Sequence, residues 1–218
     1  MKPATWYEGR TSLELLRGQD WAWIGLRSGD GLNRLHSELL LALDHLFIEL
    51  RWSGIRRVAL SGAGWMTDRG HHFSAGADLH EVGALDVVTA EPFSRRGQRV
   101  MTHLLWPGWR SLTVISGVAM GGGCDLALHG QERWAVAADA TGKGGLRLAH
   151  PAAKHGILTG FGGTVRLPDI LGLEEAGRLF REFETWGEAT ALEYGAIHRI
   201  VAPDEVGGAI RAWLDPGF

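Results

Sequence analysis

The sequence is short of cysteine, of net charge and of long apolar runs, and each shortage excludes a class of protein. Cys124 is the single cysteine of the 218 residues, so the chain has no internal disulfide and no cysteine-based zinc site. The formal net charge of -3 gives no electrostatic reason to expect nucleic acid or an anionic membrane as partner. No stretch approaches the roughly 20 apolar residues that span a bilayer.

The N-terminal stretch also lacks an apolar run after Lys2, so we expect no signal peptide and a cytoplasmic location. Lysine is scarce as well, with three lysines against nineteen arginines, a bias that suggests a GC-rich bacterial source. What is present fits one soluble domain over residues 1–218, because 45% of the residues are hydrophobic and 22% charged.

Glycine and tryptophan are abundant instead. The 32 glycines predict many tight turns or close backbone approaches. Most of the ten tryptophans are expected in the core or in an interface between subunits.

Apolar periodicity predicts an α/β domain in which helices cover a sheet. Helical spacing favours helices at residues 32–50 and 91–105, and Asp78 is placed to cap a short helix. Shorter apolar segments between turn residues predict strands, at residues 21–26, 57–60, 112–116, 134–138 and 197–201.

The densest glycine cluster, residues 121–123, follows one of these strands and opens a helix. Free N–H groups and the positive end of the helix dipole meet at such a point. A second candidate donor lies in the segment AGAD at residues 75–78, also after a strand. Two amides aimed at one point would form an oxyanion hole for a carbonyl oxygen. The alternative is that these glycines only permit a tight turn and close packing, and the residues alone leave both interpretations open.

Other uses of these residues are less well supported. The sequence has no phosphate-binding GxxxxGK[ST] loop, and GKGG at residues 142–145 lacks dinucleotide-binding spacing. It has no GxSxG nucleophile elbow. His71 and His72 are adjacent but have no HExxH or cysteine partner, so we expect no metal.

Three segments, in order, carry a resemblance to a known family. HHFSAGADLHEV at residues 71–82 resembles the FxAGADLxEM segment of the crotonase (enoyl-CoA hydratase/isomerase) superfamily. VISGVAMGGGCDLAL at residues 114–128 resembles its strand–GGG–acid–helix segment, and GILTGFGGTVRLPDILG at residues 156–172 resembles GxxPGFGGTQRLPRLIG. The likeness extends from about Trp21 to Glu205.

The resemblance implies a spiral of strand–strand–helix repeats, assembled as a homotrimer or hexamer. The chain ends at Phe218, so the family's C-terminal helical region is expected to be truncated. The two oxyanion amides fall on Ala77 and Gly122. Contacts to the coenzyme A thioester are expected from the neighbouring positions Ala75, Gly76, Asp78 and Gly121. Coenzyme A would be part of the substrate, and no separate cofactor is implied.

Two departures from the family pattern concern the acid and base groups. Hydratases of the family have a glutamate where this chain has Asp125, and a second glutamate where it has Ala152. His150 and His155 flank that vacated position and could supply a base near neutral pH. Asp125, His150 and His155 are therefore the catalytic candidates.

We expect an acyl-CoA or carrier-bound thioester to form an enolate that leads to isomerisation, hydration or dehydration, or decarboxylation. The alternative is a non-catalytic accessory subunit that binds a thioester beside a homologue or synthase.

Overall fold

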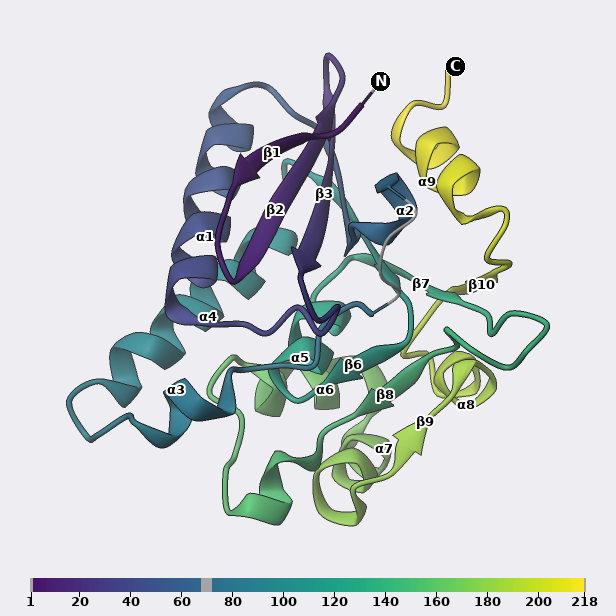
Figure 1. Ribbon diagram of the computed structural model, residues 1–218. Helices are drawn as coiled ribbons and strands as arrows, with labels where there is room; N and C mark the ends of the chain where they lie inside the picture. The colour runs from purple at the N-terminus through teal and green to yellow at the C-terminus, as the bar shows by residue number, and fades with distance from the viewer. Residues whose placement is uncertain (1, 68–71, 218) are drawn as a thin grey trace.

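In a computed structural model, residues 2–67 and 72–217 are described, without the side chains of Met66, Thr67 and His155. Within these residues a seven-stranded sheet has the order β1-β2-β3-β4-β5-β7-β10 (Figure 1). The first three strands pair antiparallel, and the neighbours from β3 to β10 pair parallel. The strands are β1 (Ala4–Tyr7), β2 (Thr11–Arg17), β3 (Trp21–Ser28), β4 (Arg57–Gly62), β5 (Arg110–Ile115), β7 (Glu132–Val136) and β10 (Arg199–Val201).

Helices cover both faces of this sheet, which explains why its strands are apolar on both sides. On one face, α1 (Ser37–Trp52) and α4 (Ala90–Leu104) pack together over side chains such as Ile24 and Leu60. On the other face, α2 (Gly64–Thr67) and α9 (Val206–Leu214) lie beside Trp23. Figure 1 shows the α1–α4 pair and α9 on opposite sides of the sheet.

A smaller second sheet gives the fold its spiral form. It contains β6 (Val118–Met120), β8 (Arg147–Ala149) and β9 (Thr185–Trp186). β6 pairs parallel with β8, and Ser74 forms a parallel bridge to Ala119 of β6. Three successive turns of the chain therefore share one arrangement. Each turn places a strand in the large sheet and its next extended segment in or beside the small sheet. The pairs are β4 and Ser74, β5 and β6, and β7 and β8.

Short helices follow or connect these turns. They are α3 (Leu79–Gly83), α5 (Gly122–Leu128), the 3₁₀ helix η1 (Pro151–His155), α6 (Gly163–Leu171), α7 (Leu173–Gly177), the π-helical η2 (Arg178–Glu182) and α8 (Glu188–Glu193). In the part of the chain that is described, no helix is both long and apolar enough to cross a membrane.

The predicted α/β class, the five strands and the helix at 91–105 are confirmed, but the helix predicted to start at residue 32 begins at Ser37. Asn33 has a φ of +48°, which interrupts helical geometry. Its side-chain oxygen accepts from the Ser28 amide at 2.9 Å. The His36 imidazole caps the helix by accepting from the Leu39 amide at 3.3 Å.

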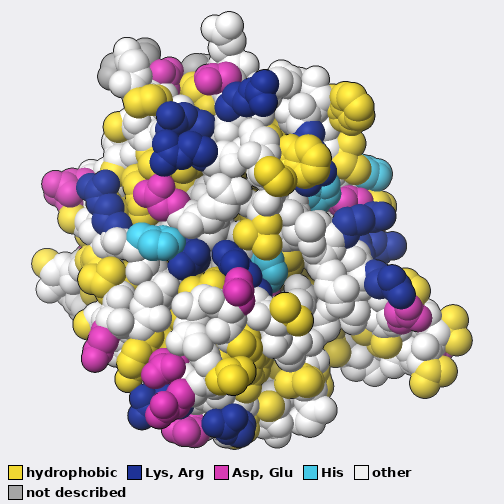
Figure 2. All heavy atoms as spheres, turned by 180° about the vertical axis from the view of Figure 1, so that it is seen from behind, with side chains coloured by type: hydrophobic (Ala, Val, Ile, Leu, Met, Phe, Trp, Pro, Cys, Tyr) yellow, Lys and Arg dark blue, Asp and Glu magenta, His cyan; other side chains and the backbone are white. Residues whose placement is uncertain are grey.

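The tryptophans are divided between interior and surface. Trp23, Trp109, Trp134 and Trp186 are buried, whereas Trp52 is 88% exposed. Figure 2 shows that charged side chains of both signs are interspersed on the face seen from behind. That face therefore carries no broad field of a single sign, which agrees with the small net charge.

Candidate functional site

A pocket of about 500 Å³ opens where the second-sheet segments of three successive turns end. It is lined by Ala75 and Ala77 after the Ser74 bridge, by Gly121 and Gly122 after β6, and by residues 150–152 after β8. The parallel ladder fixes this convergence, because Met120 lies beside Ala149 and the Gly121 amide donates to the Ala149 carbonyl at 3.0 Å. Ligands commonly bind at such carboxyl ends of parallel strands.

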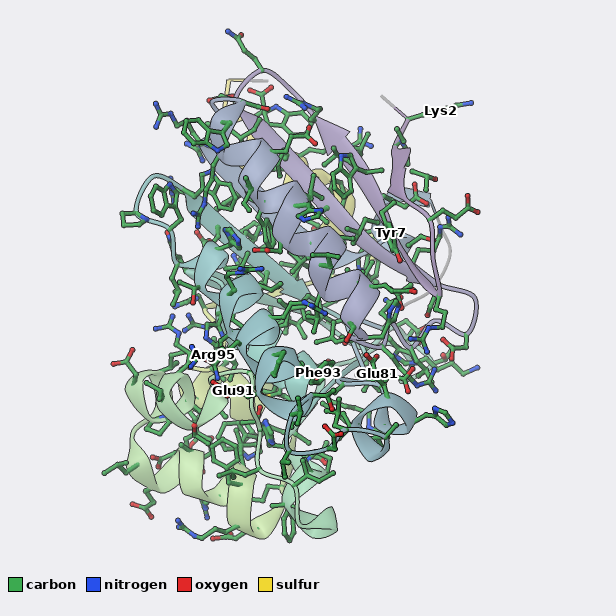
Figure 3. The ribbon with its side chains drawn as sticks, turned by 90° about the vertical axis from the view of Figure 1, so that its left-hand side faces the viewer. Lys2, Tyr7, Glu81, Glu91, Phe93 and Arg95 are labelled. Atoms are coloured by element: carbon green, nitrogen blue, oxygen red, sulfur yellow. The ribbon has the colours of Figure 1, made fainter. Side chains whose placement is uncertain are left out.

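The rest of the pocket wall is largely apolar. The side chains of Leu79, Val82 and Leu85 come from α3 and the residues after it, and Phe93 comes from α4. Figure 3 shows α3 and α4 side by side, with Phe93 near α3 and Glu91 and Arg95 paired on the outside of α4. Ile157, Leu158 and Phe161 complete the wall. Such a lining suits an acyl chain rather than a charged ligand.

Two backbone amides meet at the pocket floor. In the described part of the chain, neither the Ala77 nor the Gly122 N–H donates a hydrogen bond. They are close together, because a methyl group built on Gly122 would lie 3.5 Å from the Ala77 nitrogen. Paired free donors beside an apolar cavity can receive a carbonyl oxygen, as an oxyanion hole requires.

The two backbone segments that carry these amides can lie this close together only because both contain glycine. Gly76 has a φ of +95°, and a Cβ there would lie 2.2 Å from the Met120 carbonyl oxygen. Gly121 precedes α5 with a φ of +53°. Both conformations are unfavourable for other residues. The glycines therefore provide the tight turn and the close approach at the same time, so the two sequence interpretations are compatible.

Phe161 packs between two helices at the same place. A Cβ on Gly97 of α4 would lie 2.1 Å from its ring, and one on Gly122 would lie 2.7 Å from it. The Phe93 ring lies 5.3 Å away between centroids. Phe161 is thus held in one position beside the free amides.

A buried polar network lies on another side of the pocket. Nε2 of His150 is 3.2 Å from Oδ1 of Asp125, and Thr159 donates its hydroxyl proton to Oδ2 of the same carboxylate. The Phe161 amide donates to the Thr159 oxygen at 3.2 Å. Both carboxylate oxygens are therefore occupied, as burial of a charged group demands.

Asp125 itself does not reach the pocket surface. Its side chain is fully buried on α5, while His150 lines the pocket. The backbone of Gly163 lies against it, because a Cβ there would be 1.9 Å from Oδ1. Nδ1 of His129 contacts the Asp125 carbonyl at 2.6 Å, and burial lowers the pKa of this histidine, so it stays neutral near pH 7.

The structure therefore brings some of the predicted site residues together in one pocket and places others elsewhere. Ala75, Ala77, Gly121, Gly122 and His150 line one pocket. Three other predicted residues do not line it: Gly76 packs against the backbone of Met120, Asp125 is covered by His150 and Thr159, and Asp78 pairs with Arg10.

Asp78 caps α3 by accepting from the His80 amide at 3.0 Å and pairs with Arg10 at 2.9 Å. The predicted cap is confirmed, and this carboxylate is occupied by protein partners. His155 ends η1, but its side chain lies outside the described residues, as does His71.

Thr159 was not predicted from the sequence. It occupies the proline position of the GxxPGFGG pattern, and this departure from the pattern is the signal that could have identified it.

Comparisons with known proteins agree with this architecture. The family model described as enoyl-CoA hydratase/isomerase matches residues 22–215. The chain is 30% identical over 176 residues to the short-chain-enoyl-CoA hydratase of Clostridium acetobutylicum, covering 80% of this chain and 63% of that protein. It is 30% identical over 134 residues to the crotonyl-CoA hydratase of Syntrophomonas wolfei, covering 62% and 49%. The chain thus spans less than two thirds of the length of these relatives.

Solved structures show the same fold. DspI of Pseudomonas aeruginosa superposes with a TM-score of 0.83 at 27% identity, covering 96% of this chain and 75% of that one. The enoyl-CoA hydratase of Thermoplasma volcanium superposes with a TM-score of 0.79 at 24% identity, covering 93% and 77%. With its spiral of strand–strand–helix turns, the chain belongs to the enoyl-CoA hydratase/isomerase family.

Proposed function

We propose that this protein is an enzyme that binds an acyl-CoA thioester and stabilises its enolate with the amides of Ala77 and Gly122. The observation that carries the proposal is the pair of free N–H groups at the floor of an apolar pocket. Negative charge on the thioester oxygen is greatest in the enolate, so fixed donors there favour proton removal from the adjacent carbon.

The shape and lining of the pocket support an acyl substrate. A cavity of about 500 Å³ lined by leucine, isoleucine and phenylalanine side chains accepts an apolar chain. The hydratase names of the relatives agree with a coenzyme A carrier, so coenzyme A is proposed as part of the substrate, without a separate cofactor. Family membership and the intact amide pair do not favour an accessory, non-catalytic role.

Assembly into a homo-oligomer, a trimer or hexamer, is part of the proposal. Val165 of α6 is 76% exposed and Leu173 of α7 is 81% exposed. Large apolar side chains this exposed are often covered by a neighbouring subunit.

Infrared difference spectroscopy tests the thioester proposal directly. Butyryl-CoA labelled with ¹³C at the carbonyl is mixed with the protein, and the carbonyl band of the bound thioester is compared with that of the free one. Two hydrogen bonds should weaken the C=O bond and move the band to lower frequency. Calorimetry should show micromolar binding for butyryl-CoA and far weaker binding for butyrate.

The controls distinguish recognition of coenzyme A from recognition of the acyl group. Coenzyme A without an acyl group reports binding that does not involve the amides. A bound thioester whose carbonyl band is unshifted would contradict the role of Ala77 and Gly122. No binding of butyryl-CoA at millimolar concentration would contradict the coenzyme A proposal and favour a carrier-protein thioester.

A further inference from the structure

His150 is the only titratable side chain among the described residues that line the pocket. The position that follows Pro151 on the same wall is Ala152, which carries no acid or base. Asp125 is completely buried behind His150. Among the described residues, a ligand in this pocket therefore meets one group that can accept and return a proton.

The hydrogen bond to Asp125 leaves one ring nitrogen of His150 for a ligand. An ionised Asp125 can only accept, so Nε2 of His150 carries the proton of the 3.2 Å hydrogen bond. The tautomer with a proton on Nε2 has its lone pair on Nδ1. Because Nε2 is committed to Asp125, Nδ1 is the nitrogen available to a substrate.

The imidazole is also held in one orientation. Its ring centroid lies 4.7 Å from that of Phe180 in η2, and its side chain is 1% exposed. Asp125 from α5 is the charged group in contact with it, whereas Phe180 and the nearby Thr159 are uncharged. Thr159 fixes the second carboxylate oxygen, so the carboxylate cannot rotate away from the ring without losing a hydrogen bond.

We propose that His150 is the catalytic proton carrier, that Asp125 is its positioning residue, and that the reaction is isomerisation of a 3-enoyl thioester to the 2-enoyl thioester. This inference rests on the proposed thioester binding at Ala77 and Gly122. It assigns a substrate class that one proton carrier can convert, since removal and return of the proton use the same group.

The step balances without another reactant. Nδ1 of neutral His150 takes a proton from Cα, and the C–H electron pair forms a dienolate whose oxygen accepts from the two amides. The double bond between Cβ and Cγ moves to between Cα and Cβ as the imidazolium returns its proton to Cγ. His150 ends neutral. Asp125 stays ionised and stabilises the imidazolium between the two transfers.

Hydration of a 2-enoyl thioester would require a second proton-transfer group in the same pocket. Water must be deprotonated on one side of the substrate while Cα is protonated, which paired carboxylates would perform. Ala152 supplies neither proton acceptor nor donor. One histidine therefore favours the proton shift over the addition of water.

The experiment follows conversion of 3-butenoyl-CoA and 3-octenoyl-CoA to their 2-enoyl products by the intact protein. His150→Gln keeps a hydrogen-bonding side chain but cannot carry a proton, so kcat should fall by roughly 10²-fold or more while KM changes little. The matched control is His103→Gln, because His103 is also buried against a carboxylate, at 2.8 Å from Asp44, but does not line the pocket. His103→Gln should retain wild-type turnover.

Two further readouts distinguish a chemical role from a structural one. Free imidazole should restore turnover to His150→Ala but not to His150→Gln, whose side chain fills the space. Asp125→Asn should lower kcat with little change in KM, because the imidazolium loses its counter-charge, and Asp125→Glu should restore part of kcat.

The outcomes separate this inference from the proposed function. Wild-type turnover in His150→Gln would overturn it, as would hydration of 2-butenoyl-CoA by the wild type without any isomerisation of 3-enoyl substrates. A retained carbonyl shift with lost turnover in His150→Gln, together with imidazole rescue of His150→Ala, would support it. An unshifted carbonyl band in the wild type would instead overturn the proposed function itself.

Discussion

The ring of Phe161 covers Gly122 so closely that a methyl group on this glycine would lie 2.7 Å from the ring carbon Cδ2. Gly122→Ala should therefore displace Phe161 into the pocket and weaken binding of the thioester. Calorimetry with butyryl-CoA measures this loss. Gly122→Pro adds the same Cβ, so it would not isolate the contribution of the amide hydrogen.

Gly208 of α9 is the matched glycine control, because a Cβ there would meet nothing within 4 Å. Gly208→Ala should leave binding unchanged and stabilise the fold by about 0.5–1 kcal/mol, since alanine loses less backbone entropy in a helix. Wild-type affinity in Gly122→Ala would show that Phe161 can move without changing the site.

Ala152 offers a gain-of-function prediction. Ala152→Glu places a carboxylate on the pocket wall beside His150, which provides the second group that water addition needs. We expect hydration of 2-butenoyl-CoA to increase above that of the wild type, measured by loss of enoyl absorbance. Ala152→Gln has nearly the same size without the charge, and equal gain in both variants would contradict an acid–base explanation.

Buried histidines predict how stability depends on pH. Burial lowers the pKa of His36, His103 and His129 below the ordinary value, with the Asp44 hydrogen bond opposing it at His103. The unfolded chain therefore binds more protons as the pH falls through about 6.5. This part of the stability is fully present above that pH and is lost as the pH decreases towards the folded-state pKa values.

Urea unfolding at pH 7.5 and pH 5.5 measures the effect. The free energy of unfolding should be smaller at the lower pH. His103→Gln removes one of the three groups and should reduce the difference between the two pH values. An unchanged difference would show that His103 contributes nothing to it.

Subunit contacts are predicted to involve the exposed apolar residues of α6 and α7. Leu173→Glu should lower the molar mass found by light scattering, because a charge would enter the contact. Val87→Glu adds the same charge at a side chain that is 94% exposed between α3 and α4, so a loss of mass in Leu173→Glu alone would place the contact at α7. A monomeric wild type would contradict the proposed assembly.

The sequence predicted those parts of the fold that short-range patterns encode. The strand at residues 21–26 and the helix at 91–105 have clear apolar periodicity, and both are confirmed. The pattern did not predict the start of α1, because Asn33 interrupts an apparently helical segment through contacts with Ser28 and with the backbone of His72 at 2.9 Å. Such long-range hydrogen bonds leave no periodic trace.

The site was partly predictable for a related reason. Glycine motifs identified the segments that bring Ala77 and Gly122 together, since close backbone approach requires glycine nearby. The relationship of His150 to Asp125 was not evident, because the two residues are 25 positions apart and meet only through the ladder of the small sheet. Sequence spacing cannot show that one side chain covers another.

The small sheet also sets a scale for the chemistry. Neighbouring strands of a parallel sheet are separated by about 4.8 Å, and Ala77, Gly122 and His150 each follow one of three neighbouring segments, at Ser74, β6 and β8. Backbone hydrogen bonding therefore sets the spacing of the three segments, and the contacts of His150 with Asp125 and Phe180 set where its ring lies. A single substitution beside this sheet, such as Ala152→Glu, can therefore alter the reaction while the backbone segments that carry the two amides keep their spacing.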